Sequence, residues 1–143
     1  MKKYKIEKVV TIDAAGKLES EKTGEVVYGV GFAMGERGAV RYLTEDILMK
    51  KEIPIEAIAI KMKPEEALMP MKKEILDSIP KIEKYLEEIL KSSKERNILI
   101  YCAGVTIGVG NNGKDFEKAV KKIKENLRRE KRTERRKRVF WIR

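Results

Sequence analysis

The chain has 143 residues, of which 39% are charged, and a formal net charge of +10. This length suits one domain with a core that needs no disulfide, and the single cysteine, Cys102, excludes an internal one. The absence of histidine excludes Ser-His-Asp and Cys-His catalysis within the chain, and one cysteine cannot supply a zinc site.

The distribution of apolar residues bears on location. Each apolar run is shorter than the roughly 20 residues that span a bilayer, and the charged N-terminus lacks the apolar segment of a secretory signal. We therefore expect a cytoplasmic protein without a transmembrane segment. Lysine, glutamate and isoleucine are abundant, a bias typical of thermophilic proteins.

The positive charge is concentrated at the C-terminus. Residues 121–143 contain 12 Lys or Arg and 3 Glu, a net charge of +9, which leaves +1 for the rest of the chain. A nearly neutral body thus carries a basic tail.

The first half of the chain predicts alternating strands and helices. Residues 4–13 favour a strand, residues 38–51 a helix that ends before Pro54, and residues 55–62 a second strand. A strand, a helix and a strand in this order imply a right-handed crossover and a parallel sheet.

The segment between the first strand and the first helix is ambiguous. Its β-branched and aromatic residues alternate with small ones, which favours a strand. Its apolar residues also fall at helical spacing, with Thr23 as N-cap and Gly35 as C-cap. We predict a helix over residues 25–34, chiefly because of a family resemblance given below.

The second half predicts helices around one more strand. Pro64 opens a short helix, and residues 71–90 form a longer one that Pro80 must kink or split, with Ser78 as a possible cap of its second part. Residues 97–103 are an apolar run typical of a buried parallel strand, and a helix follows with Asp115 as its N-cap.

These elements predict a single three-layer α/β domain over residues 1–127. It would contain a small, mostly parallel sheet of three or four strands with flanking helices. Residues 128–143 would form a basic, helical C-terminal extension, because the apolar stripe stops at Leu127 while helix-forming residues continue.

Three segments together carry a family resemblance: residues 23–35, 61–75 and 108–111. They resemble the conserved part of an archaeal protein family of unassigned function, over about residues 9–112. The resemblance implies no catalytic residue. It favours a helix over residues 25–34.

The first functional hypothesis concerns the glycine-rich loop after the last predicted strand. Unpaired N–H groups and the dipole of the following helix can bind a phosphate- or carboxylate-bearing small molecule. If the first and last strands are neighbours, Asp13 lies at the same sheet edge and can add a hydroxyl or metal contact. The predicted ligand-binding residues are Asp13, Gly104, Thr106, Gly108, Gly110, Asn111, Asn112 and Gly113.

Simpler interpretations of these residues stay open. Asp13 can bond only its own turn backbone, and glycine-rich loops are often only turns. Cys102 lies in an apolar run, so we expect a buried, inert thiol rather than a nucleophile. The sequence identifies no cofactor and does not decide whether the protein is an enzyme.

The alternative hypotheses concern the basic tail. Its cationic side chains can contact the phosphates of RNA or DNA while an aromatic ring stacks on bases, although charge runs are usually solvated surface. The residues involved would be Arg128, Arg129, Arg132, Arg135, Arg136, Lys137, Arg138 and Trp141. A structural protein would instead dock the apolar residues 139–142 on its body or on a second copy, forming a homo-oligomer.

Overall fold

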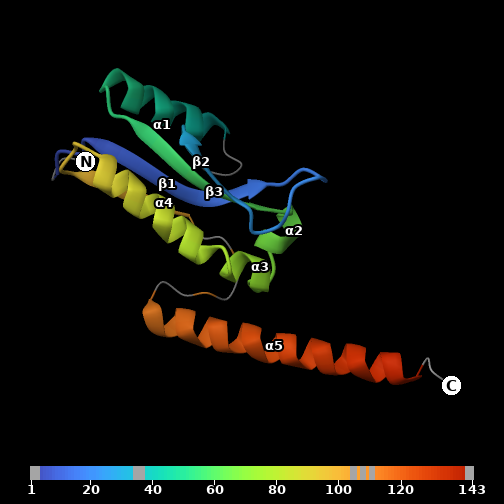
Figure 1. Ribbon diagram of the computed structural model, residues 1–143. Helices are drawn as coiled ribbons and strands as arrows, with labels where there is room; N and C mark the ends of the chain where they lie inside the picture. Colours follow the sequence, from blue (N-terminus) through green and yellow to red (C-terminus); the bar gives the residue numbers. More distant parts are fainter. Residues whose placement is uncertain (1–3, 34–37, 104–105, 107–108, 110–111, 141–143) are drawn as a thin grey trace.

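The computed structural model describes residues 4–33, 38–103, 106, 109 and 112–140, with the backbone alone for residues 130 and 134–140 (Figure 1). The strands are β1 (Lys8–Gly16), β2 (Val26–Val30), β3 (Ile55–Met62) and β4 (Ile98–Cys102). The helices are α1 (Gly38–Lys50), α2 (Pro64–Ala67), α3 (Lys73–Leu76), α4 (Ile79–Ser92) and α5 (Gly113–Phe140).

The four strands form one sheet in the order β2-β3-β1-β4. β1 pairs in parallel with both β3 and β4, so that Ile12 lies between Ile58 and Cys102. β2 pairs antiparallel with β3. The predicted α/β class with a small, mostly parallel sheet is confirmed.

Helices cover the two faces of this sheet (Figure 1). On the α4 face, Ile58, Ile60 and Ile89 belong to the larger buried cluster, and on the α1 face Val9 packs with Leu48. Full burial of one such aliphatic side chain stabilises the fold by about 1.5–3 kcal/mol. The central strands β1 and β3 are rich in apolar residues because both of their faces are covered.

The predicted helix over residues 25–34 is wrong, because Val26–Val30 is strand β2. Its β-branched residues suit a pleated sheet, and the backbone N–H of Lys61 on β3 donates to the carbonyl of Glu25 at 2.8 Å. Thr23 is no helix cap, since its hydroxyl donates to Glu66 Oε2 at 2.8 Å. Gly35 lies outside the described residues.

Pro80 divides the long predicted helix into α3 and α4, as expected. The proline lies in the first turn of α4, where its missing N–H leaves no bond unmade. Ser78 occupies the N-cap position, but its side chain does not cap α4. Its hydroxyl donates to the carbonyl of Ile75 at 2.7 Å, which ties α4 to α3 instead.

Strand β4 pairs in parallel as predicted, but it lies at the edge of the sheet, so the prediction that it is buried is wrong. Leu99, Ile100 and Tyr101 retain 40%, 38% and 45% exposure. Cys102 is also exposed, contrary to the expected buried thiol. An apolar run of this length satisfies both a central and an edge strand, so its composition alone does not decide its place.

Helix α5 begins at Gly113, two residues before the predicted start, and continues without a break past Leu127. The predicted boundary between domain and extension therefore falls inside one helix. Ile123 is buried, while the remaining apolar residues of the stripe are partly covered: Phe116, Ala119, Val120 and Leu127. Among the described helices, none is long and apolar enough to cross a membrane.

Candidate functional site

The parallel pairing of β1 and β4 places Asp13 beside the start of the glycine-rich loop. The N–H of Ala103, the first residue after β4, donates to the carbonyl of Ile12 at 2.9 Å. The prediction that β1 ends at Asp13 is wrong, since β3 continues to pair with β1 as far as Gly16. Asp13 is only 7% exposed, and its Oδ1 accepts a 2.7 Å hydrogen bond from the N–H of Ala14.

Part of the predicted loop site lies outside the described residues, namely Gly104, Gly108, Gly110 and Asn111. Thr106 is described, and its hydroxyl oxygen is buried without a hydrogen-bond partner among the described residues. The structure therefore brings Asp13 close to where the loop begins. The ligand-binding role of these residues stays a prediction.

Asn112 caps α5, so the prediction of Asp115 as the N-cap is wrong. The side-chain Oδ1 of Asn112 accepts from the N–H of Asp115 at 3.0 Å, and its Nδ2 donates to Asp115 Oδ2 at 2.6 Å. The carboxylate of Asp115 also lies in the first turn of the helix, where the dipole favours a negative charge. The side chains of Asn112 and Asp115 thus occupy part of the N-terminal end of α5 that would otherwise attract an anion.

A cleft of about 670 Å³ lies between the chain segment 69–74 and one side of α5. Its apolar lining includes Met71 and Ile123, and Val109 of the glycine-rich loop contributes as well. Three lysines also line it: Lys72, Lys73 and Lys122. Glu74 lines the cleft as well, and Lys72 and Lys73 form ion pairs with Glu66 and Asp77. The cleft therefore combines apolar surface with charges of both signs.

Glu66, which sequence reasoning missed, fixes one wall of this cleft. Its carboxylate accepts hydrogen bonds from Thr23 Oγ1 at 2.8 Å, from the N–H of Lys63 at 2.8 Å and from Lys72 Nζ at 2.7 Å. Burial alone would raise the pKa of Glu66, but these bonds hold that pKa at about 2. Only the bond to Lys63 had a signal in the sequence, because Pro64 at the start of α2 makes Glu66 the third helical residue, whose side chain commonly bonds back to the N-cap N–H.

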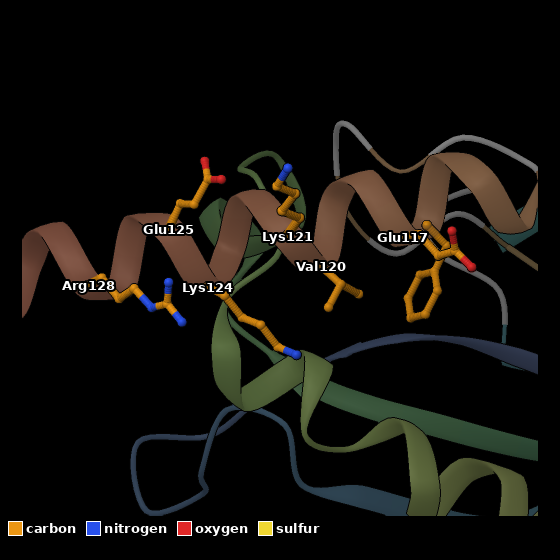
Figure 2. A pocket seen from close by; sticks show the side chains of 7 residues that line it. Glu117, Val120, Lys121, Lys124, Glu125 and Arg128 are labelled. Atoms are coloured by element: carbon orange, nitrogen blue, oxygen red, sulfur yellow. The ribbon is translucent and has the colours of Figure 1, made fainter.

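The other flank of α5 borders a second hollow of about 450 Å³. Figure 2 shows Val120 and Lys124 on the side of the helix that faces the sheet, whereas Lys121 and Glu125 point the other way. Charged side chains thus surround α5 on both its inner and outer sides.

Basic residues dominate the surface of α5 beyond these hollows. Exposed lysines and arginines follow one another along the helix: Lys121, Lys122, Lys124, Arg128, Arg129, Lys131 and Arg132. Figure 1 shows that the C-terminal half of α5 extends beyond the sheet and its covering helices.

Three of the predicted tail residues, Arg128, Arg129 and Arg132, are exposed as expected. The others up to position 138 lie on the same helix, with only their backbone described: Arg135, Arg136, Lys137 and Arg138. Trp141 lies outside the described residues, and so does part of the apolar segment 139–142. The nucleic-acid and docking roles stay predictions.

Metal-ligating side chains do not cluster in the described part of the chain. There, no three His, Cys, Asp or Glu residues lie close enough together to hold a metal ion. Although Cys102 is exposed, partial desolvation by its neighbours raises the pKa of its thiol above the ordinary value.

Residues 1–112 match the C-terminal domain of DUF1512, a domain of unknown function. The match covers β1 to β4 and ends before α5. No curated protein and no solved structure matches the chain. The comparisons thus supply a family and no activity.

Proposed function

The chain belongs to the DUF1512 C-terminal family, and from its geometry we propose that it binds RNA or DNA through the basic surface of α5. The observation that carries the proposal is the uninterrupted helix Gly113–Phe140, whose lysines and arginines are exposed wherever their side chains are described. We prefer this function to a small-molecule site at the glycine-rich loop, because the side chain of Asn112, one of the predicted ligand-binding residues, is engaged in capping α5.

The charge distribution supports contact with phosphates. The net charge is +9 over residues 121–143 and +1 over the remainder, so the excess positive charge is not a general property of the surface. Each phosphate that a lysine or arginine neutralises releases counterions, which makes binding strongly dependent on salt. No recognition motif accompanies the helix in the sequence, so we expect affinity for the backbone rather than for base sequence.

The test measures binding of fluorescent single- and double-stranded RNA and DNA over a series of salt concentrations. We expect binding at low salt that falls steeply as salt rises, and about tenfold or greater loss when Arg128, Arg129 and Arg132 are all changed to glutamate. A variant that ends after Leu127 should lose binding as well. Absence of binding at low salt would refute the proposal.

A matched control separates a binding surface from net charge. Lys22, Lys51 and Lys94 are exposed lysines of the body, and changing all three to glutamate alters the net charge by the same amount. This variant should keep most of the binding. Equal loss in both triple variants would show that total charge, rather than α5, attracts the nucleic acid.

A second candidate function is the binding of an anionic small molecule, and the cleft beside α5 favours it. Its volume of about 670 Å³ lies within the range of ligand pockets, about 300–1,000 Å³. Lysines 72, 73 and 122 would meet a phosphate or carboxylate, and Met71 and Ile123 an apolar part of the ligand. Val109 of the glycine-rich loop would contribute to this site, whereas Asp13 alternates with Val9 onto the α1 face of the sheet, away from the cleft.

Melting scans with inorganic phosphate, nucleotides and small carboxylates test the second candidate. We expect one class to raise the melting temperature of the wild-type protein but not of Lys122→Ala. The control is Lys114→Ala, which removes an exposed lysine of the same helix that does not line the cleft. If no compound raises the melting temperature, the cleft is not such a site.

A further inference from the structure

The free edge of the sheet at β4 has no charged residue. β4 pairs with β1 alone among the described strands, and its five residues are Ile98, Leu99, Ile100, Tyr101 and Cys102. Edge strands usually carry lysine, proline or a bulge that prevents pairing with another chain. None of these features interrupts β4.

The direction of the backbone groups on β4 follows from its bonds to β1. Asn97 accepts through its carbonyl from Glu7, and Ala103 donates through its N–H to Ile12. In a parallel ladder, alternate residues bond to the same neighbour, so the odd-numbered residues of β4 face β1. The even-numbered ones, Ile98, Ile100 and Cys102, direct their N–H and C=O groups to the free edge.

From this edge we infer that two copies of the chain pair through β4, antiparallel about a two-fold axis at Ile100, into one continuous eight-stranded sheet. Ile100 then exchanges both backbone hydrogen bonds with Ile100 of the second copy. Ile98 faces Cys102 in the same way, and Leu99 lies across from Tyr101. The inference does not depend on the proposed function.

Charge permits a second copy as the partner of this strand. The part of the chain that carries β4 is nearly neutral, with a net charge of +1 outside residues 121–143, so net charge does not oppose the approach of two copies there. β4 has no charge, so two copies can meet there without like charges in contact. Self-pairing through β4 also closes after two copies, whereas pairing of β4 with β2 of the next chain would continue into a fibre.

The pattern of pairing predicts a specific cross-link. Leu99 and Tyr101 of the other copy would form a non-hydrogen-bonded pair with Cα atoms about 4.5 Å apart, inside the range that a disulfide spans. Residues 99 of the two copies would lie diagonally, about 7–8 Å apart, which is too far. Both side chains are substantially exposed, so cysteines at these positions should not disturb folding.

The test uses the full chain with Cys102→Ser as background. The variant Leu99→Cys/Tyr101→Cys should form a covalent dimer under mild oxidation, seen on a non-reducing gel, whereas each single cysteine variant should not. Cross-linking into a ladder of higher species would show open-ended association and overturn the inference. Equal cross-linking of all three variants would show random collision and overturn it as well.

A second measurement uses sedimentation of the protein without cross-links. The wild-type chain should sediment as a dimer at micromolar concentration, and Ile100→Lys should weaken the dimer about tenfold or more, because two lysines would lie directly opposite each other. The control is Val30→Lys, which places the same charge on the other edge of the sheet at a side chain that is 94% exposed. It should leave the dimer intact.

Two results would overturn the inference. One is a wild-type chain that remains monomeric. The other is a dimer that survives Ile100→Lys but is lost when the chain is ended after Leu127, since this would place the contact in the C-terminal segment. Circular dichroism and melting temperatures of each variant would show that the fold persists.

Discussion

The two edges of the sheet differ in how far neighbouring side chains cover them, although both edge strands are five residues long and largely apolar. At the β2 edge, Lys81 on α4 donates to the carbonyl of Val26 at 3.1 Å, and Tyr28 stacks on Tyr85 with ring centroids 5.7 Å apart. At the β4 edge, three large apolar side chains remain about two-fifths exposed. An edge strand is therefore defined by its neighbours more than by its own composition.

Contacts across the sheet anchor the β2 edge further. The hydroxyl of Tyr28 donates to Glu56 Oε2 at 2.9 Å, and Glu56 Oε1 forms a 2.7 Å ion pair with Lys8 on β1. Three adjacent strands are thus joined by one series of polar contacts on the α4 face. The described residues of β4 have no such connection, which is consistent with a strand that another molecule completes.

The largest expected effect is the loss of stability when a side chain in the interior of the sheet is truncated. Ile60→Ala removes a side chain that is 2% exposed and lies opposite Val26 of β2, so it should lower the free energy of unfolding by about 2–5 kcal/mol. Ile100→Ala on β4 should cost less than about 1 kcal/mol in dilute, monomeric protein, because its side chain is already partly exposed. Urea denaturation measures both, and similar losses would contradict the difference in burial.

Glu66 gives the second prediction, because it anchors the segment that leads into β2. Glu66→Gln should lower the free energy of unfolding at neutral pH by about 1–3 kcal/mol, since Thr23, Lys63 and Lys72 lose their charged acceptor. The folded-state pKa of Glu66 is about 2, below its ordinary value of 4.5. Its contribution is therefore complete above pH 4.5 and is lost as the pH falls toward 2.

Urea denaturation at several pH values distinguishes this charge effect from a packing effect. The difference between wild type and Glu66→Gln should shrink as the pH falls through this interval, because protonated glutamate resembles glutamine. A difference that stays constant down to pH 2 would show that shape, rather than the carboxylate, is what matters.

The third prediction removes the protection of the β2 edge. Lys81→Met keeps the length of the side chain but deletes the donor to Val26 and the ammonium group that lies 5.6 Å from the Tyr85 ring centre. We expect a loss of about 1 kcal/mol in unfolding free energy, and new, concentration-dependent light scattering. Lys84→Met, on the exposed side of the same helix, is the control.

The smallest effect is expected at the hydroxyl of Tyr28. Tyr28→Phe keeps the stacking on Tyr85 and deletes only the exposed hydrogen bond to Glu56, so the loss should be about 0.5 kcal/mol. Burial and the nearby Glu56 carboxylate raise the pKa of Tyr28 above its ordinary value. Spectroscopic titration should therefore show one late-ionising tyrosine in the wild type that is missing from the variant.

Local signals in the sequence predicted most elements of the fold. Helix α1 and strand β3 have nearly the predicted bounds, because Pro54 separates two segments of different periodicity. Strand β2 was mistaken for a helix because its valines satisfy helical spacing as well as alternation. Only its pairing with β3, which is distant in sequence, decides between the two.

The candidate site was predictable only where chain order determines it. The condition that the first and last strands are neighbours is met, and the residue after Ile12, Asp13, lies next to Ala103 at the end of β4. The capping role of Asn112 was missed because an asparagine in a loop suits a ligand contact equally well. Glu66 was missed because Thr23 lies 43 positions away from it along the chain.

The length of α5 has a geometric consequence for anything that binds along it. At 1.5 Å per residue, its 28 residues form a straight rod about 42 Å long. This exceeds one turn of duplex DNA, about 34 Å. A duplex curves away from such a rod within one turn, so the rod meets only part of it at a time, whereas a single strand can adapt to its whole length.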